Sequence, residues 1–457
     1  MTRAFGLLII LAGCVVGPDY QRPDVDVPQS WRAAAADTQA LRADEWWKLF
    51  DDPLLDRLVD AALAGNRDIK IAAARILEAR ANVVVARSFL YPQVTAQTTA
   101  ARTRAASSVT PPGASPVGED YRLQGDLSFE LDLWGRLRRA SEAARADLLA
   151  TRYAREVTRL ALISTAANGY FNLRSLDLQR DIALRTVASR AESLSLTQKR
   201  FRGGVVSELD VRQAEAEYQA ASAIIPDLQR QIIVQEDALS TLLGRYPGEI
   251  QRGKTINAIS VPPDVPVGLP SELLARRPDI LATEQSLIAA NAQIGAAKAA
   301  YFPSISLTGL LGVESAELSS LLRGGSRIWQ AGVGAGLPIF NVGRIGAQVD
   351  AASARQEQAL QQYRQTIETA FAEVEDALAA LRTAREKYNT IEAQAKALRR
   401  SLRLADLRYR NGQSAYIEVL DAERNLFNAE LGQVQTRQSQ LAALVQLYKA
   451  LGGGWER

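Results

Sequence analysis

The stretch from Tyr121 to Leu133 alternates apolar and polar side chains, and it constrains the fold more than any other feature of the sequence. Its apolar register holds Tyr121, Leu123, Leu127, Phe129, Leu131 and Leu133, with Gly125 in the same register, and its polar register holds Arg122, Gln124, Asp126, Ser128, Glu130 and Asp132. A period of two predicts a strand with one apolar and one charged face. Soluble strands average about five or six residues, whereas about ten tilted residues cross a bilayer. The stretch is therefore typical of a membrane β-barrel wall or of an edge strand in a soluble sandwich.

The chain also contains a tandem repeat. Asp68-Ile69 and Tyr91-Pro92 recur 211 positions later as Asp279-Ile280 and Phe302-Pro303. Further pairs recur at an offset of 208: Gly135-Arg136 with Gly343-Arg344, Phe201 with Tyr409, Gly204 with Gly412, Asp210 with Glu418, and Leu243-Gly244 with Leu451-Gly452. The change in offset falls in a hairpin loop, where a change of length costs little. A register kept over this distance indicates duplication of one structural unit.

The repeat predicts the organisation of the whole chain. Residues 1–13 are expected to be a signal segment, 14–57 an N-terminal tail that lies against a folded body, and 251–270 a proline-rich linker. The first repeat, 58–250, is expected to hold a helix, a β-hairpin at 92–133 and long helices at 137–201 and 207–243. The second, 271–457, is expected to hold a helix, a hairpin at 303–338 and long helices at 343–411 and 414–451. The longer helices would extend on the order of 95 Å.

Two hairpins supply four strands, which cannot close a barrel, because the smallest membrane barrels have eight. An open edge in lipid leaves several kcal/mol unsatisfied at each backbone group. The chain is therefore expected to associate with copies of itself. Two copies would provide eight strands and three would provide twelve.

The N-terminus has the pattern of a secretion signal. Arg3 precedes an apolar run from Ala4 to Ala12, which is too short to span a membrane. The run ends in Leu11-Ala12-Gly13-Cys14, which resembles a bacterial lipobox, so Cys14 is the expected lipidation site. Several acyl chains, at about 0.8 kcal/mol per buried CH₂, would give a durable anchor. The alternative is that Cys14 is a small apolar residue without a role. Because the signal is unusually short, a start codon further upstream is also expected.

Composition argues against an enzyme. The chain has no histidine, one cysteine and one methionine, Met1. Histidine-based acid–base chemistry, ordinary zinc sites and soft copper ligands are therefore not expected. The net charge of +3 is spread along the chain, unlike a nucleic-acid footprint, and the sequence has no Gly-x-x-x-x-Gly-Lys-Ser/Thr loop. We expect neither a cofactor nor a nucleic-acid partner.

Three segments resemble a known family: the lipobox, the stretch from Val16 to Pro23, and the motif from Gly268 to Ile280 with its Arg276-Arg277-Pro278 core. They are similar to the TolC-type outer-membrane factors, specifically the NodT/OprM-like efflux lipoproteins. The resemblance implies a mostly α-helical homotrimer with a twelve-stranded β-barrel in outer-membrane lipid, a twelve-helix periplasmic barrel and an equatorial domain. It also implies a passive duct for drugs, toxic compounds or metals. The implied partners are a periplasmic membrane-fusion adaptor and an inner-membrane transporter of the resistance-nodulation-division (RND) class.

The same resemblance implies a periplasmic gate in the turn from Tyr409 to Asp421. Carried over by position, Glu418 and Asp421 would ring the closed aperture, and Tyr409 and Asp210 would tie neighbouring hairpins together. The two carboxylates lie three residues apart and hence on one helix face. At Ser414 this sequence departs from the arginine of the best-known family member. An alternative is that these acids only favour a helix N-terminus, where the helix dipole stabilises negative charge.

Two other functions remain open at this stage. One is the outer-membrane channel of an ABC-linked type I exporter of proteins or peptides, against which the lipobox and the Arg-Arg-Pro-Asp motif argue. The other is a periplasmic coiled-coil lipoprotein scaffold, which would explain the helices but give no role to four bilayer-length strands.

The lipobox can be tested with Cys14→Ser, which removes the only thiol that could be acylated. The variant should lose incorporation of labelled palmitate but keep its barrel, so it should still fractionate with outer membranes. Failure to reach the outer membrane would mean that the anchor does more than tether the protein.

Overall fold

The computed structural model describes residues 15–32, 45–262, 265 and 268–453. The expected signal segment and Cys14 lie outside these residues. The described chain forms two compact units. The first comprises residues 15–24, 74–152 and 282–364, and the second comprises the rest of the described chain.

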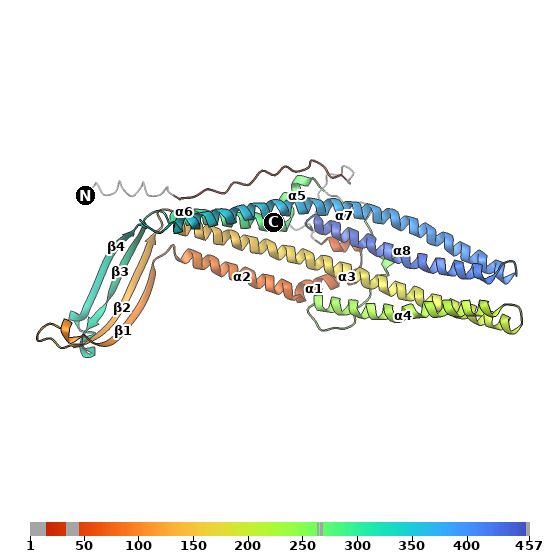
Figure 1. The fold of residues 1–457 in the computed structure, drawn as a ribbon, viewed down its shortest axis with the longest axis horizontal. Helices are drawn as coiled ribbons and strands as arrows, with labels where there is room; N and C mark the ends of the chain where they lie inside the picture. The colour runs from red at the N-terminus through yellow and green to blue at the C-terminus, as the bar shows by residue number, and fades with distance from the viewer. Residues whose placement is uncertain (1–14, 33–44, 263–264, 266–267, 454–457) are drawn as a thin grey trace. The chain divides into compact units, whose positions relative to one another are not determined.

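The first unit holds one antiparallel sheet in the order β1-β2-β3-β4 (Figure 1). Its strands are β1 (Gln93–Arg104), β2 (Val117–Leu131), β3 (Ser304–Ser315) and β4 (Arg327–Gly336). The alternating stretch is β2, but this strand ends at Leu131 rather than Leu133. The reason is that the Asp132 carboxylate accepts from the backbone N–H groups of Leu137 and Arg138, at 3.0 and 2.9 Å, and so caps the next helix.

The two hairpins have equivalent registers. In the first hairpin Gln93 lies opposite Ser128, and in the second Ser304 lies opposite Gly336. The second pair stands 211 and 208 positions after the first, which are the offsets of the sequence repeat. The repeats join in the middle of the sheet, where β2 pairs with β3 from Leu131 opposite Ile305 to Tyr121 opposite Ser315. Strands β1 and β4 are left as the edges of the sheet.

Eight α-helices lie within the described residues: α1 (Pro53–Gly65), α2 (Arg67–Ser88), α3 (Arg136–Arg202), α4 (Glu208–Leu242), α5 (Pro270–Arg276), α6 (Pro278–Ala299), α7 (Arg344–Arg410) and α8 (Tyr416–Ala450). Helices α3 and α7 have 67 residues each, and α4 and α8 have 35 each. Pro226 lies inside α4, and the helix continues on both sides of it. No helix in the described part of the chain combines the length and apolarity needed to cross a membrane.

The described part of the N-terminal tail, which the family resemblance places on an equatorial domain, is divided between the two units. Residues 15–24 belong to the unit that holds the sheet. There Val16 N–H donates to the Trp134 carbonyl at 3.0 Å, and Arg22 pairs with Glu284 of α6 at 2.9 Å. Gly17 has a φ of +105°, and a Cβ at this position would collide with Gly295 of α6. The absence of side chains at both glycines therefore lets this segment lie directly on the helix.

The later part of the tail contains helical segments. Residues Trp46–Phe50 form a short 3-10 helix, and α1 begins at Pro53. The Trp46 and Trp47 side chains are buried, and Trp46 stacks on Tyr448 of α8 with ring centroids 5.1 Å apart. These aromatic contacts fix the segment in the core of the second unit.

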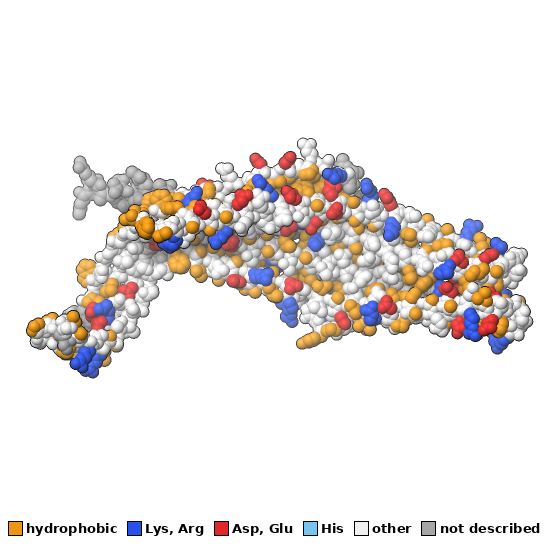
Figure 2. All heavy atoms as spheres, viewed as in Figure 1, with side chains coloured by type: hydrophobic (Ala, Val, Ile, Leu, Met, Phe, Trp, Pro, Cys, Tyr) orange, Lys and Arg blue, Asp and Glu red, His pale blue; other side chains and the backbone are white. Residues whose placement is uncertain are grey.

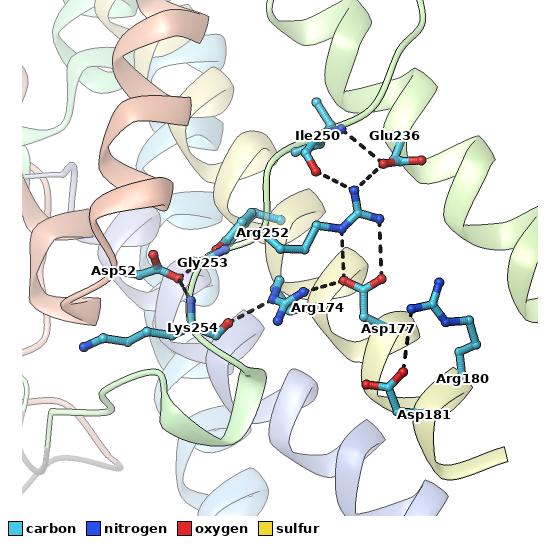
Figure 3. Close-up of polar contacts among 11 residues, drawn as sticks. Asp52, Arg174, Asp177, Arg180, Asp181, Glu236, Ile250, Arg252, Gly253 and Lys254 are labelled. Atoms are coloured by element: carbon cyan, nitrogen blue, oxygen red, sulfur yellow. Dashed lines mark hydrogen bonds and ion pairs between the residues drawn. The ribbon is translucent and has the colours of Figure 1, made fainter. Parts of the chain in front are cut away.

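Asp52 joins three elements of this core. Its fully buried carboxylate accepts from the Leu54 N–H at the start of α1, the Tyr170 hydroxyl of α3 and the Lys254 N–H, at 3.0, 2.7 and 3.1 Å. Figure 3 shows it beside Gly253 and Lys254. Burial and this carboxylate raise the Tyr170 pKa, so the phenol stays neutral and donates its proton.

Asp52→Ala should lower the free energy of unfolding by about 3 kcal/mol, because it leaves the buried Tyr170 hydroxyl and two partly buried backbone N–H groups without their acceptor. The urea midpoint of helix unfolding, followed by circular dichroism, measures the loss. The matched control is Asp51→Asn, at an exposed carboxylate 2.6 Å from the Lys254 ammonium. Asn tolerates the φ of +52° at this position, and loss of an exposed pair should cost about 1 kcal/mol or less. Equal effects of the two variants would contradict this role of Asp52.

Candidate functional site

Two equivalent turns join the long helices within the second unit. In Figure 1, α4 runs back along α3, and α8 runs back along α7. Gly204 and Gly412 occupy the same place in the two turns, with φ values of +72° and +71°. The Val205 N–H donates to the Arg200 carbonyl, and the Gln413 N–H donates to the Arg408 carbonyl, at 2.9 and 2.8 Å. Both turns are thus glycine-terminated helix ends, and differences in their function must come from side chains.

The first turn uses its acidic residue as a cap. The Asp210 carboxylate accepts from the Ser207 N–H at 2.9 Å, and the Ser207 hydroxyl accepts from the Asp210 N–H at 3.3 Å. This reciprocal pair is a capping box. The alternative interpretation, that the acid stabilises a helix start, therefore accounts for the contacts of Asp210.

The second turn has no such pair. Ala415 replaces the serine, and no side chain caps the start of α8. Glu418, equivalent to Asp210, has its carboxylate 3.9 Å from Arg408 and keeps 46% of its side chain exposed. Asp421 pairs with Arg424 at 2.5 Å and accepts from the Asn425 amide at 3.0 Å, with 55% of its side chain exposed. Figure 2 shows acidic and basic side chains intermixed at this end of the helices. Both carboxylates remain accessible to ions.

Tyr409 lies in a buried cluster. Its ring packs against Tyr416 with centroids 5.1 Å apart, and the Arg200 guanidinium of α3 lies 4.5 Å from the Tyr409 ring centroid. Ala214 of α4 and Leu420 of α8 belong to the same cluster. Within one chain, Tyr409 thus joins the α3–α4 hairpin to the α7–α8 hairpin through packing and a cation–π contact.

Sequence reasoning did not identify Tyr416 and Glu423, although both face this cluster. Burial raises the pKa of Tyr416 to about 12. Tyr416, Val419, Glu423 and Phe427 follow the spacing of one helix face, and Tyr416, Val419 and Phe427 are buried. A glutamate on an otherwise apolar stripe is the signal that could have identified Glu423.

A cavity of about 650 Å³ lies between α3 and the segment after α4. Figure 3 shows the charged groups of its wall contacting one another. Arg174 pairs with Asp177 at 2.5 Å, and Arg252 pairs with Asp177 at 3.2 Å and also with Glu236. These charges compensate one another. The side chains of the cavity wall therefore have a structural role, because they hold residues 250–254 against α3.

Comparison with known proteins identifies the family. The model of the outer membrane efflux protein family matches twice, over residues 58–245 and 269–453. A probable efflux pump outer membrane protein of Pseudomonas putida, TtgC, is 37% identical over 454 residues, covering 98% of this chain and 94% of that protein. The cation efflux system protein CusC of Escherichia coli is 35% identical over 460 residues, covering 99% and 98%.

The fold agrees with these sequence matches. The crystal structure of the CmeC outer membrane channel of Campylobacter jejuni matches with a TM-score of 0.92 and 30% identity, over 97% of this chain and 96% of that one. The family resemblance inferred from the N-terminal and Arg-Arg-Pro-Asp motifs is thus confirmed. The chain belongs to the outer membrane efflux protein family.

Proposed function

We propose that this protein is the outer-membrane channel of a tripartite RND-type efflux pump, a passive duct formed by three copies of the chain. The relatives TtgC and CusC are named as outer-membrane and cation efflux proteins, which supports export as the common activity. The partners would be a periplasmic adaptor and an inner-membrane transporter, which would supply the energy. Selection of the substrate would lie in the transporter.

The observation that carries the proposal is the pair of free edges on the sheet. Strands β1 and β4 each have one row of backbone groups that no other strand of the described residues pairs with. In lipid these groups must be paired. Pairing β4 of one copy with β1 of the next satisfies both rows, and repetition of this contact closes a ring. Three copies would give the twelve-stranded barrel that the family resemblance implies.

The internal repeat specifies the register of this contact. Within the chain, the second strand of one repeat pairs with the first strand of the other, and Gly125 lies opposite Leu311. Shifting these positions by the repeat offsets of 208 and 211 places Val333 opposite Ala100 of the next copy. The same shift places Ala335 opposite Thr98 of the next copy.

Side chains next to the sheet support the same arrangement. After β2, Trp134 stacks on Phe302 with centroids 4.7 Å apart and donates to the Pro303 carbonyl at 2.7 Å. The equivalent position after β4 is Val342, which is 85% exposed, and its neighbour Phe340 is 87% exposed. Tyr91, equivalent to Phe302, is 59% exposed. These surfaces would cover one another if the contact inside the chain were repeated between copies.

The ring can be tested by cross-linking in outer membranes. Val333→Cys combined with Ala100→Cys should form disulfides under mild oxidation, because directly opposed residues lie within disulfide reach. Gels without reductant should show dimers and a closed trimer that thiols dissociate. The control, Val333→Cys with Thr98→Cys, is two residues out of register and should cross-link far less. The parent with Cys14 alone gives the background. A product that stops at the dimer would indicate an eight-stranded ring, and a monomer in every variant would contradict the proposal.

The gate can be tested by neutralising its two carboxylates. Glu418→Gln with Asp421→Asn should raise single-channel conductance in planar bilayers. It should also raise the concentration of divalent cation needed for block by on the order of tenfold, because like charges gathered on the axis attract cations. The control, Glu208→Gln, neutralises an exposed acid in the first turn of α4, which pairs with Arg212 at 3.1 Å, and should leave block unchanged. If the double variant is blocked like the parent, the two acids act only at the helix start.

A further inference from the structure

A cavity of about 620 Å³ lies behind the proposed gate, within the second unit, and is lined by α3, α7 and α8. Leu196, Leu402 and Val419 form part of its apolar wall. Glu423 of α8 places its carboxylate in this wall, together with the phenol rings of Tyr409 and Tyr416. The cavity therefore borders α8, the helix that carries the gate acids, and α3 of the other hairpin.

The polar atoms in this region are poorly satisfied. The Ser193 hydroxyl of α3 donates to Glu423 Oε1 over a long distance of 3.4 Å. Glu423 Oε2 is buried and accepts no hydrogen bond from any described residue. The Tyr409 and Tyr416 side chains are only 7% and 4% exposed. Their hydroxyls make no well-formed hydrogen bond to a described residue, although the Tyr416 hydroxyl faces the side chains of Ser193 and Thr197. An ionised carboxylate is costly to hold in such surroundings.

The charges around Glu423 only partly compensate it. Arg190 of α3 favours the ionised form, but Arg190 also pairs with Glu217 of α4 at 3.0 Å. Glu217 and Asp406 of α7 oppose ionisation, and Asp406 pairs with Arg410 at 2.9 Å. The other charged groups lining the cavity are Glu192, Arg200, Arg399 and Arg403. Burial is the largest effect, and it raises the pKa of Glu423 above its ordinary value near 4.5.

The first repeat provides a contrast. Glu215 stands 208 positions before Glu423 and occupies the equivalent place on α4. It pairs with Arg212 at 2.9 Å and keeps 45% of its side chain exposed. Only the second repeat thus presents its glutamate to the interior between the hairpins.

We propose that Glu423 is a proton-dependent latch: its neutral form holds α8 against α3, and its ionised form loosens this contact and eases opening of the gate. The inference rests on the proposed channel function. Separation of the two hairpins would let water reach Glu423 Oε2 and the two phenols, which recovers the hydration lost in the packed state.

The sign of the pH effect follows from the raised pKa of Glu423 in the packed state. The packed state keeps its full advantage below the ordinary glutamate pKa, where the carboxyl is protonated whether the contact is packed or loosened. This advantage is lost as pH rises from the ordinary value through the raised one. One proton per copy can change the opening equilibrium by up to about tenfold per pH unit.

The latch can be tested with the full-length protein in planar bilayers, by measuring open probability as the pH on the periplasmic side is raised above 4.5. The parent should open more as pH rises. Glu423→Gln, which resembles the neutral form, should stay at the low-pH level throughout. The matched control Glu215→Gln should follow the parent. An unchanged pH profile in Glu423→Gln would overturn the latch.

Hydrogen exchange gives a second measurement that does not require conduction. At each pH, the exchange of residues 190–200 and 416–427 is compared between the parent and Glu423→Gln, which cancels the intrinsic effect of pH on exchange. The parent should exchange faster than the variant at high pH and equally at low pH. Equal exchange at every pH would also overturn the latch. If all variants fail to conduct, the channel proposal fails, whereas conduction with divalent block but no effect of Glu423→Gln rejects the latch alone.

Discussion

The unpaired edges of the four-stranded sheet are the constraint on which the rest of the structure depends. Backbone groups on β1 and β4 have no partner strand within the described chain. The central pairing of β2 with β3 already joins one repeat to the other, from Leu131 opposite Ile305 onward. The duplicated sheet therefore has edge strands that require a partner strand. The β2–β3 pairing inside the chain shows how such a partner strand would pair. A chain that contains two copies of such a unit can close a ring only with further chains, because its four strands are too few for a barrel.

Duplication also allowed the two halves to diverge. The helix turns share a glycine with positive φ at Gly204 and Gly412. In the first turn, Ser207 engages the local carboxylate in a capping box, whereas Ala415 leaves Glu418 without such a partner. One turn is thus internally satisfied, and the other exposes acidic groups. The same divergence exposes Glu215 and turns Glu423 inward, so the second repeat carries the features suited to a gate.

The sequence predicts the parts of this structure that depend on local pattern. Alternation identifies β2, and the repeat offsets describe the pairing of both hairpins. The strand end at Leu131 was missed because Asp132 is used by the following helix. The contact of Ser193 with Glu423 joins positions 230 residues apart, so no local pattern contains it. The placement of residues 15–24 likewise depends on the close approach of Gly17 and Gly295, which are distant in sequence.

Two groups of buried polar atoms in the second unit, those that contact Asp52 and those at the helix turns, differ in their hydrogen bonding. Near α1, the Asp52 carboxylate receives three hydrogen bonds, and Arg277 at the start of α6 donates to Asp279, Glu373 and the Ala450 carbonyl. At the helix turns, by contrast, two phenol hydroxyls and one carboxylate oxygen are buried and make no well-formed hydrogen bond to a described residue. Each such group costs about 1–3 kcal/mol, which is recovered when water reaches it. Segments that move must come from the less stable part of a fold. The incomplete hydrogen bonding of the turns therefore fits the proposed gate, and the hydrogen-bonded network of Asp52 would be the fixed base from which the helices move.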